Sequence, residues 1–121
     1  MKELDEQLWI SEYNIGKKML VKRNINNYEV YYIFTIKDLL KSENIDQSTY
    51  ILENAYYFSI PSINEIKCYC YDDINKFKFD WQDKVYLIDA NTYLTLFRFF
   101  VQNDAKEKTN INFEELFKIM I

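Results

Sequence analysis

The stretch YEVYYIF, residues 28–34, decides the fold class of this chain. Successive residues of an extended strand point to opposite faces of a sheet. Here both faces are largely apolar, with Tyr28, Val30, Tyr32 and Phe34 on one and Glu29, Tyr31 and Ile33 on the other. A strand with two apolar faces is typical of the middle of a sheet. We therefore expect residues 28–34 to form a central strand.

The residues before this strand predict a hairpin. Residues 8–23 are rich in β-branched and aromatic side chains and contain the only glycine of the chain, Gly16. Glycine supplies the positive φ that a tight turn needs, so we expect the bend at residues 14–16. A second turn is expected at residues 24–27, because asparagine tolerates left-handed backbone and hydrogen-bonds its own backbone.

The residues after the central strand predict a helix and two further strands. Thr35 and Asp38 resemble a capping box and precede an apolar helical face, so we expect a short helix that ends near Glu43. Residues 48–59 fit a helix only partly and a strand only partly, and we interpret them as strand. Residues 66–71 alternate with a period of two, which predicts a strand with one face inward.

The last part of the chain predicts a meander covered by helices. Phe77, Phe79, the turn at residues 80–83 and the run 85–88 indicate an antiparallel meander. Asp89 is a suitable N-cap for the strongest helix, whose apolar stripe is Tyr93, Leu94, Leu96, Phe97, Phe100 and Val101. A capping signal at residues 112–115 predicts another helix. We expect one α+β domain over residues 1–121, a mainly antiparallel sheet of about five or six strands covered by two or three helices.

The composition predicts a folded, soluble, cytoplasmic protein. Hydrophobic residues make up 49% of the 121 residues, and they gain free energy only by leaving water. No uncharged stretch approaches the roughly 20 residues that cross a bilayer, and the acidic residues 1–6 lack the apolar run of a signal peptide. Cys68 and Cys70 would lie parallel on one face of a strand, which is poor geometry for a disulfide, so we expect a reducing compartment.

Two absences weigh against catalysis. The chain has no histidine, which removes the commonest general base and every nucleophile arrangement that relies on histidine. With one glycine it cannot build a glycine-rich phosphate loop, and two cysteines cannot supply four zinc ligands. We expect no enzyme activity, no cofactor and no metal.

One spacing leaves an enzyme alternative open. Glu65-Ile66-Lys67 has the acid-x-lysine spacing of the PD-(D/E)xK nucleases, in which two carboxylates hold Mg²⁺ and the lysine supports an attacking water. The second carboxylate would be Asp46 or Glu53. The structural alternative is a strand edge that carries alternating charges.

A cluster of acidic and aromatic residues is the candidate binding surface. Its members are Asp72, Asp73, Asp80, Trp81, Asp83, Tyr69 and Tyr71. Tyrosine and tryptophan carry much of the affinity at protein interfaces, and negative charge steers a basic partner. Two alternatives remain open for this cluster. The carboxylates can serve as a cation site or simply keep the turns soluble, and Trp81 can pack into the core beneath the meander.

These features favour a non-catalytic protein-binding module. A net charge of −4 weighs against direct binding of nucleic acid and favours a basic protein partner, such as a toxin or a nucleic-acid-processing enzyme. The profile resembles that of small acidic inhibitors, namely bacterial toxin-immunity proteins and phage proteins that counter host defence, and we expect the chain to occupy the partner's basic site. A further alternative is self-association as a homodimer or structural subunit through an exposed tyrosine-bearing edge strand. We expect no membrane partner.

Overall fold

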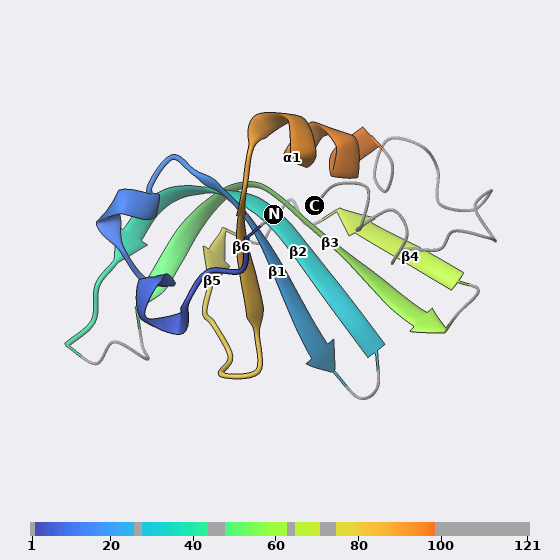
Figure 1. Cartoon of the computed structure of the whole chain (residues 1–121), viewed down its shortest axis with the longest axis horizontal. Helices are drawn as coiled ribbons and strands as arrows, with labels where there is room; N and C mark the ends of the chain where they lie inside the picture. The colour runs from blue at the N-terminus through green and yellow to red at the C-terminus, as the bar shows by residue number, and fades with distance from the viewer. Residues whose placement is uncertain (1, 26–27, 44–47, 63–64, 71–74, 99–121) are drawn as a thin grey trace.

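The computed structural model describes residues 2–25, 28–43, 48–62, 65–70 and 75–98, and for residues 28 and 58–70 it describes the backbone alone (Figure 1). Its elements are the 3-10 turns η1 (Glu6–Leu8) and η2 (Glu12–Asn14), the strands β1 (Lys18–Ile25), β2 (Tyr28–Leu40), β3 (Thr49–Ser62), β4 (Glu65–Cys70), β5 (Lys76–Phe77) and β6 (Lys84–Ile88), and the helix α1 (Ala90–Phe97). Within the described residues the strands form one antiparallel sheet, in the order β4-β3-β2-β1-β6, with β5 also paired to β3.

The central position of residues 28–34 is confirmed, because β2 lies between β1 and β3. The expected helix from Thr35 to Glu43 is wrong, since β2 continues to Leu40. Ile36 pairs with Leu52 of β3, and both side chains are buried in the core. A capping box stabilises a helix by less free energy than a buried cross-strand pair stabilises a strand. Pairing with β3 therefore decides the conformation of these residues.

The expected hairpin over residues 8–23 is also wrong, although Gly16 does form a turn with φ of +86°. Residues 6–14 form two 3-10 turns instead of a strand. The side chain of Ser11 accepts a hydrogen bond from the Tyr13 N–H, and the amide of Asn14 donates to the carbonyl of Leu8. Such local bonds give the backbone an alternative to a strand ladder. The turn expected at residues 24–27 is only partly tested: residues 24 and 25 belong to β1, residues 26–27 lie outside the described residues, and β1 and β2 pair antiparallel with Ile25 opposite Tyr28.

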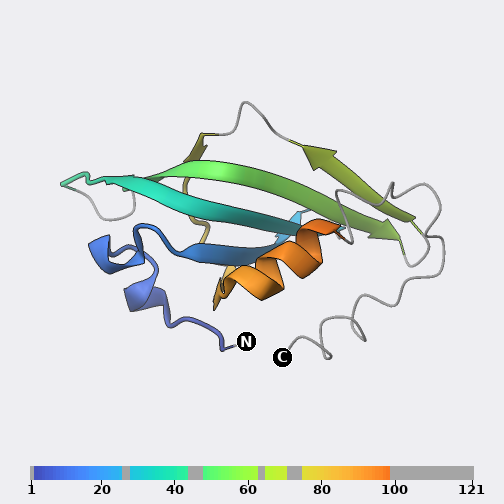
Figure 2. The same ribbon diagram turned by 90° about the horizontal axis from the view of Figure 1, so that it is seen from above.

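The strand interpretation of residues 48–59 is confirmed by β3, which pairs with β2 along most of its length. The register shifts twice, between Ile33 and Thr35 and between Ile36 and Asp38. Asn54 occupies the shifted part of β3 with φ of +49°, as expected for a bulge. Bulges bend strands, and Figure 2 shows the bowed course of β2 and β3.

The strand prediction for residues 66–71 is confirmed as β4, but the expected meander is wrong. Both β4 and β5 pair with β3, whereas β6 pairs with β1. The segment between β5 and β6, residues 78–83, therefore crosses one face of the sheet. Phe77 causes this course, because its ring packs on Phe34 and Tyr32 of β2 at centroid distances of 5.0 and 5.2 Å.

The core lies on the face that residues 78–83 cross. Its buried cluster is Trp9, Met19, Val21, Phe34, Ile36, Tyr50, Leu52, Phe77 and Val85. The other face is covered by α1, whose Tyr93 ring centroid lies 5.0 Å from the ammonium of Lys18. Lys18 precedes Met19 of the core cluster on β1, so its side chain points to the face opposite the core cluster. In Figure 1, α1 lies above the sheet.

The N-cap predicted for α1 is confirmed, since the carboxylate of Asp89 accepts a hydrogen bond of 2.7 Å from the Thr92 N–H. Tyr93 and Leu96 are buried, as the apolar stripe predicts. A mainly antiparallel sheet with one helix packed on it is thus established. Phe100 and Val101 of the stripe and the helix expected at residues 112–121 lie outside the described residues, so the second helix stays a prediction.

Candidate functional site

An open groove of about 420 Å³ lies between the N-terminal turns and the segment that joins β5 to β6. We call it the first groove, and its lining residues are Glu6, Trp9, Ile10, Ser48, Phe79, Asp80 and Trp81. The lining contains two exposed carboxylates, Glu6 and Asp80, and no lysine or arginine. Its volume falls within the range of about 300–1,000 Å³ typical of ligand clefts.

Trp81 is the most conspicuous residue of this groove, because 79% of its surface is exposed. It lies in a tight turn that is held by hydrogen bonds among the neighbouring residues. The Asp80 carboxylate accepts from the Gln82 N–H at 3.0 Å, and the Asp83 N–H donates to the Asp80 carbonyl at 2.9 Å. The Asp80 N–H in turn donates to the Asp83 carboxylate at 2.8 Å. These bonds fix the backbone of the turn, from which the mostly exposed indole projects.

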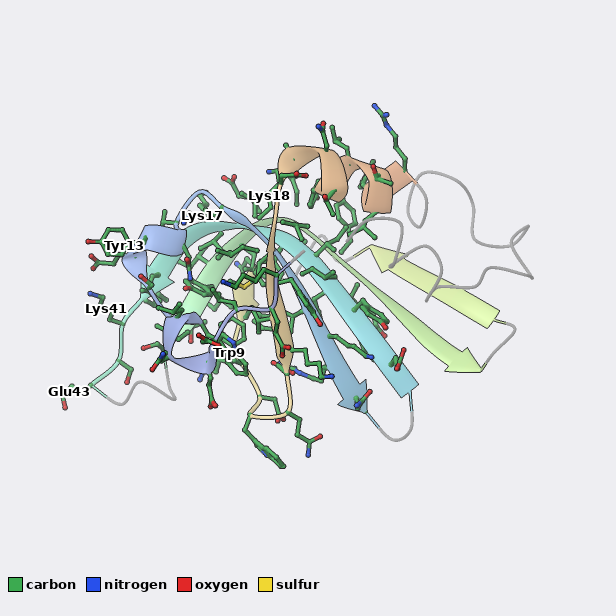
Figure 3. All side chains as sticks on the ribbon, viewed as in Figure 1. Trp9, Tyr13, Lys17, Lys18, Lys41 and Glu43 are labelled. Carbon is green, nitrogen blue, oxygen red and sulfur yellow. The ribbon has the colours of Figure 1, made fainter. Side chains whose placement is uncertain are left out.

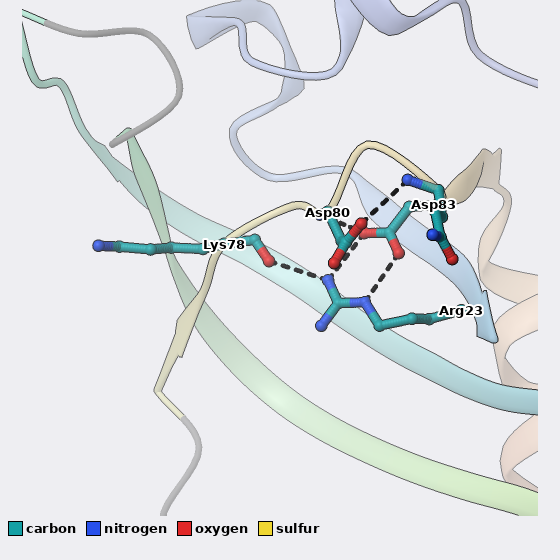
Figure 4. Close-up of polar contacts among 5 residues, drawn as sticks. Arg23, Lys78, Asp80 and Asp83 are labelled. Atoms are coloured by element: carbon teal, nitrogen blue, oxygen red, sulfur yellow. Dashed lines mark hydrogen bonds and ion pairs between the residues drawn. The ribbon is translucent and has the colours of Figure 1, made fainter. Parts of the chain in front are cut away.

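A buried ion pair fixes this turn to the sheet (Figure 4). Arg23 of β1 donates through Nε and Nη2 to the two carboxylate oxygens of Asp83, at 2.7 and 2.8 Å, and through Nη2 to the Lys78 carbonyl at 3.0 Å. The hydrogen bond to Asp83 raises the pKa of Arg23 above its usual value, although burial opposes it. A buried pair adds little net stability, but the forked geometry fixes position.

The opposite wall of the groove is fixed by Tyr50 of β3. Its hydroxyl donates to the Trp9 carbonyl at 2.6 Å and accepts from the Ser11 N–H at 2.9 Å. The amide of the buried Asn14 also donates to this hydroxyl, at 3.2 Å. One side chain of the sheet therefore satisfies several backbone groups of the N-terminal turns, and this holds those turns in place.

Aromatic rings form the floor between the two walls. Phe79 lies 5.2 Å from the ring of Trp9, 5.8 Å from that of Tyr50 and 5.1 Å from that of Phe77, measured between centroids. The indole N–H of Trp9 donates to the Leu4 carbonyl at 3.0 Å. The floor is thus a packed aromatic surface, and the indole N–H of Trp9 is hydrogen-bonded within the chain.

A second groove, of about 560 Å³, adjoins the first and shares Glu6, Ile10 and Ser48 with it. Its other lining residues are Gln7, Ser11, Glu12, Tyr13, Leu39, Lys41 and Ser42. Tyr13 is 87% exposed at its rim, and Figure 3 shows it at the same end of the molecule as Lys41. The ammonium of Lys41 lies 2.6 Å from the Glu12 carboxylate, so these two charges of the groove are paired, whereas Glu6 belongs to both grooves.

The structure brings together only part of the predicted binding surface. Asp80 and Trp81 line the first groove, and the alternative that Trp81 packs into the core is wrong. Asp83 is not a surface carboxylate, because it is buried against Arg23. Tyr69 lies on β4, where its backbone pairs with Tyr57. Tyr71, Asp72 and Asp73 lie outside the described residues, and so does part of the proposed cation site.

The strand register separates the residues of the nuclease alternative. Glu65 and Lys67 lie on β4, with Glu65 opposite Ser62. Glu53 lies nine positions before Ser62 on β3, which is roughly 30 Å at about 3.3 Å per residue, and its carboxylate lies 3.9 Å from the ammonium of Lys37. Glu53 is therefore not the second carboxylate, whereas Asp46 lies outside the described residues. In the part of the chain that the structure describes, no three potential ligand side chains gather to hold a metal ion.

The sequence did not identify the N-terminal wall of the groove. Glu6, Ile10 and Tyr13 were assigned to an acidic end and a hairpin strand, and neither assignment placed them near Trp81. The sequence does contain one signal for the N-terminal turns, because Ser11 and Asn14 are residues that favour turns over strands.

Comparison with known proteins gives no further assignment, since no protein-family model, no curated protein and no solved structure matches the chain. Among the described residues, no helix has both the length and the apolar character needed to cross a membrane.

Proposed function

We propose that this chain is a non-catalytic protein-binding module whose first groove holds a basic surface of a partner protein. The observation that carries the proposal is the presentation of Trp81. Its side chain is 79% exposed on a turn that the buried Arg23–Asp83 pair fixes to the sheet. Exposing an indole to water is unfavourable, and a fixed turn that presents one at the surface serves contact with another molecule.

A fixed backbone turn favours binding because it lowers the entropy lost on association. Tryptophan and tyrosine dominate the energetic centres of protein interfaces, and a turn that is already ordered loses little backbone freedom when they bind. Two strongly exposed aromatic residues lie at the adjoining grooves: Trp81 lines the first groove and Tyr13 lines the second. This arrangement fits a protein partner better than a reacting small molecule.

The charge of the first groove indicates the kind of partner. Glu6 and Asp80 carry negative charge into a groove whose lining has no cation. Such a potential speeds association with a basic surface and disfavours nucleic acid. The basic, nucleic-acid-facing site of a toxin or of a host defence enzyme has this complementary chemistry, so an inhibitor of the immunity or anti-defence type is the form of binding module that we propose.

The proposal is tested by photo-crosslinking in cells of the source organism. Benzoylphenylalanine at position 81 should yield a defined adduct with one protein through a lysine- or arginine-rich surface. The matched control is position 94, because Leu94 is also an exposed large apolar residue but lies on α1, away from both grooves. Absence of a protein adduct from position 81, or identical adducts from both positions, would contradict the proposal.

A further inference from the structure

The two grooves together specify what the partner inserts. The first groove combines carboxylates with aromatic faces, which is the environment that a guanidinium prefers over an ammonium. A guanidinium is planar and weakly hydrated, stacks on aromatic rings and forks onto a carboxylate, whereas an ammonium is a strongly hydrated point charge.

The protein already uses this chemistry on the same face of its sheet. The guanidinium carbon of Arg23 lies 5.3 Å from the ring centroid of Tyr32 and 5.1 Å from that of Phe77, while its nitrogens fork onto Asp83. The first groove repeats these components at the surface, with Trp81 and Phe79 as rings and Asp80 and Glu6 as carboxylates. There, however, the lining holds no cation of its own.

The second groove has a different character. Its one cation, Lys41, is paired with Glu12, and Ile10 and Leu39 are partly buried against the core. Tyr13 adds an exposed ring at the rim. Away from Glu6, where its charges are paired and Ile10 and Leu39 supply apolar surface, this groove favours an apolar side chain.

Continuity between the grooves determines the shape of the occupant. Glu6, Ile10 and Ser48 line both, so a chain that fills one groove can continue into the other. A single side chain would leave the second groove empty, whereas an extended segment fills both.

We infer that the partner presents an extended segment whose arginine occupies the first groove and whose apolar side chain occupies the second. This inference rests on the proposed function and adds the identity of the recognised element. It separates two kinds of basic partner, because a lysine-rich surface satisfies the proposed function but not this inference.

The test uses ¹⁹F NMR of the full chain labelled with 5-fluorotryptophan. The chain has two tryptophans, and Trp81→Phe identifies the resonance of position 81. The probes are the N-acetyl amides of arginine, lysine and citrulline at equal ionic strength. We expect arginine to shift the Trp81 resonance in a saturable way, lysine to bind at least threefold more weakly, and citrulline, which has the shape but not the charge, to have no effect.

Variants assign the effect to the groove. Asp80→Asn keeps the oxygen that accepts from the Gln82 N–H and removes the charge, so it should weaken arginine binding severalfold. The control Glu53→Gln removes an exposed carboxylate on β3 that lines neither groove and should leave binding unchanged.

The second groove is tested with capped peptides in which arginine and leucine are separated by one to four glycines. At the best spacing the peptide should bind about tenfold more tightly than the arginine amide, the factor expected for burying one leucine-sized side chain. Tyr13→Ala should reduce that gain without changing binding of the amide.

Equal responses to arginine and lysine, or no response of Trp81 to either, would overturn the inference. If position 81 still crosslinks to a basic protein in that case, the proposed function stands without it. If Trp81 does not respond to arginine and position 81 gives no crosslink, both the inference and the proposed function are wrong.

Discussion

The hydroxyl of Tyr50 on β3 donates a 2.6 Å hydrogen bond to the carbonyl oxygen of Trp9 and so ties the N-terminal turns to the sheet. These residues are 41 positions apart in the chain. This one hydroxyl oxygen therefore joins Trp9, Ser11 and Asn14 of the N-terminal segment to the sheet.

Tyr50→Phe keeps the ring beside Phe79 and removes this oxygen. The Trp9 carbonyl and the amide of Asn14 then lose a buried partner, so we expect a loss of about 1–3 kcal/mol in the free energy of unfolding, measured in urea. The Ser11 amide should also exchange hydrogen faster. The exposed Tyr13→Phe is the control and should change neither quantity. Unaltered exchange at Ser11 in Tyr50→Phe would show that the hydroxyl does not hold the turns.

Asp83→Asn tests the ion pair beneath the Trp81 turn. The change leaves the partly buried Arg23 without its counter-charge, and we expect a loss of roughly 3 kcal/mol in urea unfolding. The double variant Arg23→Met with Asp83→Asn should recover part of this loss, because no unpaired charge remains. The exposed pair of Lys41 and Glu12 gives the comparison, and Glu12→Gln should cost at most about 1 kcal/mol. A loss of that smaller size in Asp83→Asn would contradict the role given to the buried pair.

Trp81→Ala separates binding from stability. Its side chain is mostly exposed, so the free energy of unfolding should stay within about 0.5 kcal/mol of the wild-type value. Affinity for the crosslinked partner, measured by calorimetry, should fall roughly 30-fold, which corresponds to about 2 kcal/mol. Leu94→Ala is the matched control. Full affinity in Trp81→Ala would place the interface elsewhere.

Asp80→Asn tests the role of charge in association. The asparagine can keep the turn, so we expect a lower association rate, because steering is reduced, and a higher dissociation rate, because the contact with the partner's arginine is weakened. Stopped-flow measurements should show the difference in association rate at low salt and its disappearance near 1 M salt, where the screening length is about 3 Å. A difference in association rate that persists at high salt would contradict steering by this charge.

Asp89 makes stability depend on pH in acid. The hydrogen bond from the Thr92 backbone lowers the pKa of Asp89 in the folded state. Its stabilising contribution is therefore complete above the unfolded-state pKa of about 3.9 and is lost as the pH falls through the lower folded pKa. Asp89→Asn keeps a capping oxygen that does not titrate. Urea unfolding between pH 2 and 5 should show a smaller change with pH for this variant than for the wild type, and equal curves would exclude the effect.

Local signals predicted the fold where they agreed with long-range pairing. The two apolar faces of residues 28–34 and the cap at Asp89 led to the correct elements for this reason. At Thr35 the local signal pointed to a helix, but the partner of Ile36 is Leu52, sixteen positions later, and no local pattern reports that pairing.

The candidate site was predicted only where exposure follows from residue type and turn chemistry. Asp80 and Trp81 met that condition, whereas Asp83 looks identical to Asp80 in the sequence and is buried because Arg23 of β1 reaches it. Glu6 and Tyr13 were missed because their place beside Trp81 depends on the fold of the N-terminal turns over the sheet.

The crossing of residues 78–83 links ligand binding to the integrity of the whole sheet. These residues begin beside β3 and end at β6, so the first groove exists only while β3, β2, β1 and β6 remain paired. A partner that fills the groove binds the fully paired chain alone. At a free concentration of 100 times its dissociation constant it should therefore protect β3, β2, β1 and β6 alike by about 2.7 kcal/mol against unfolding.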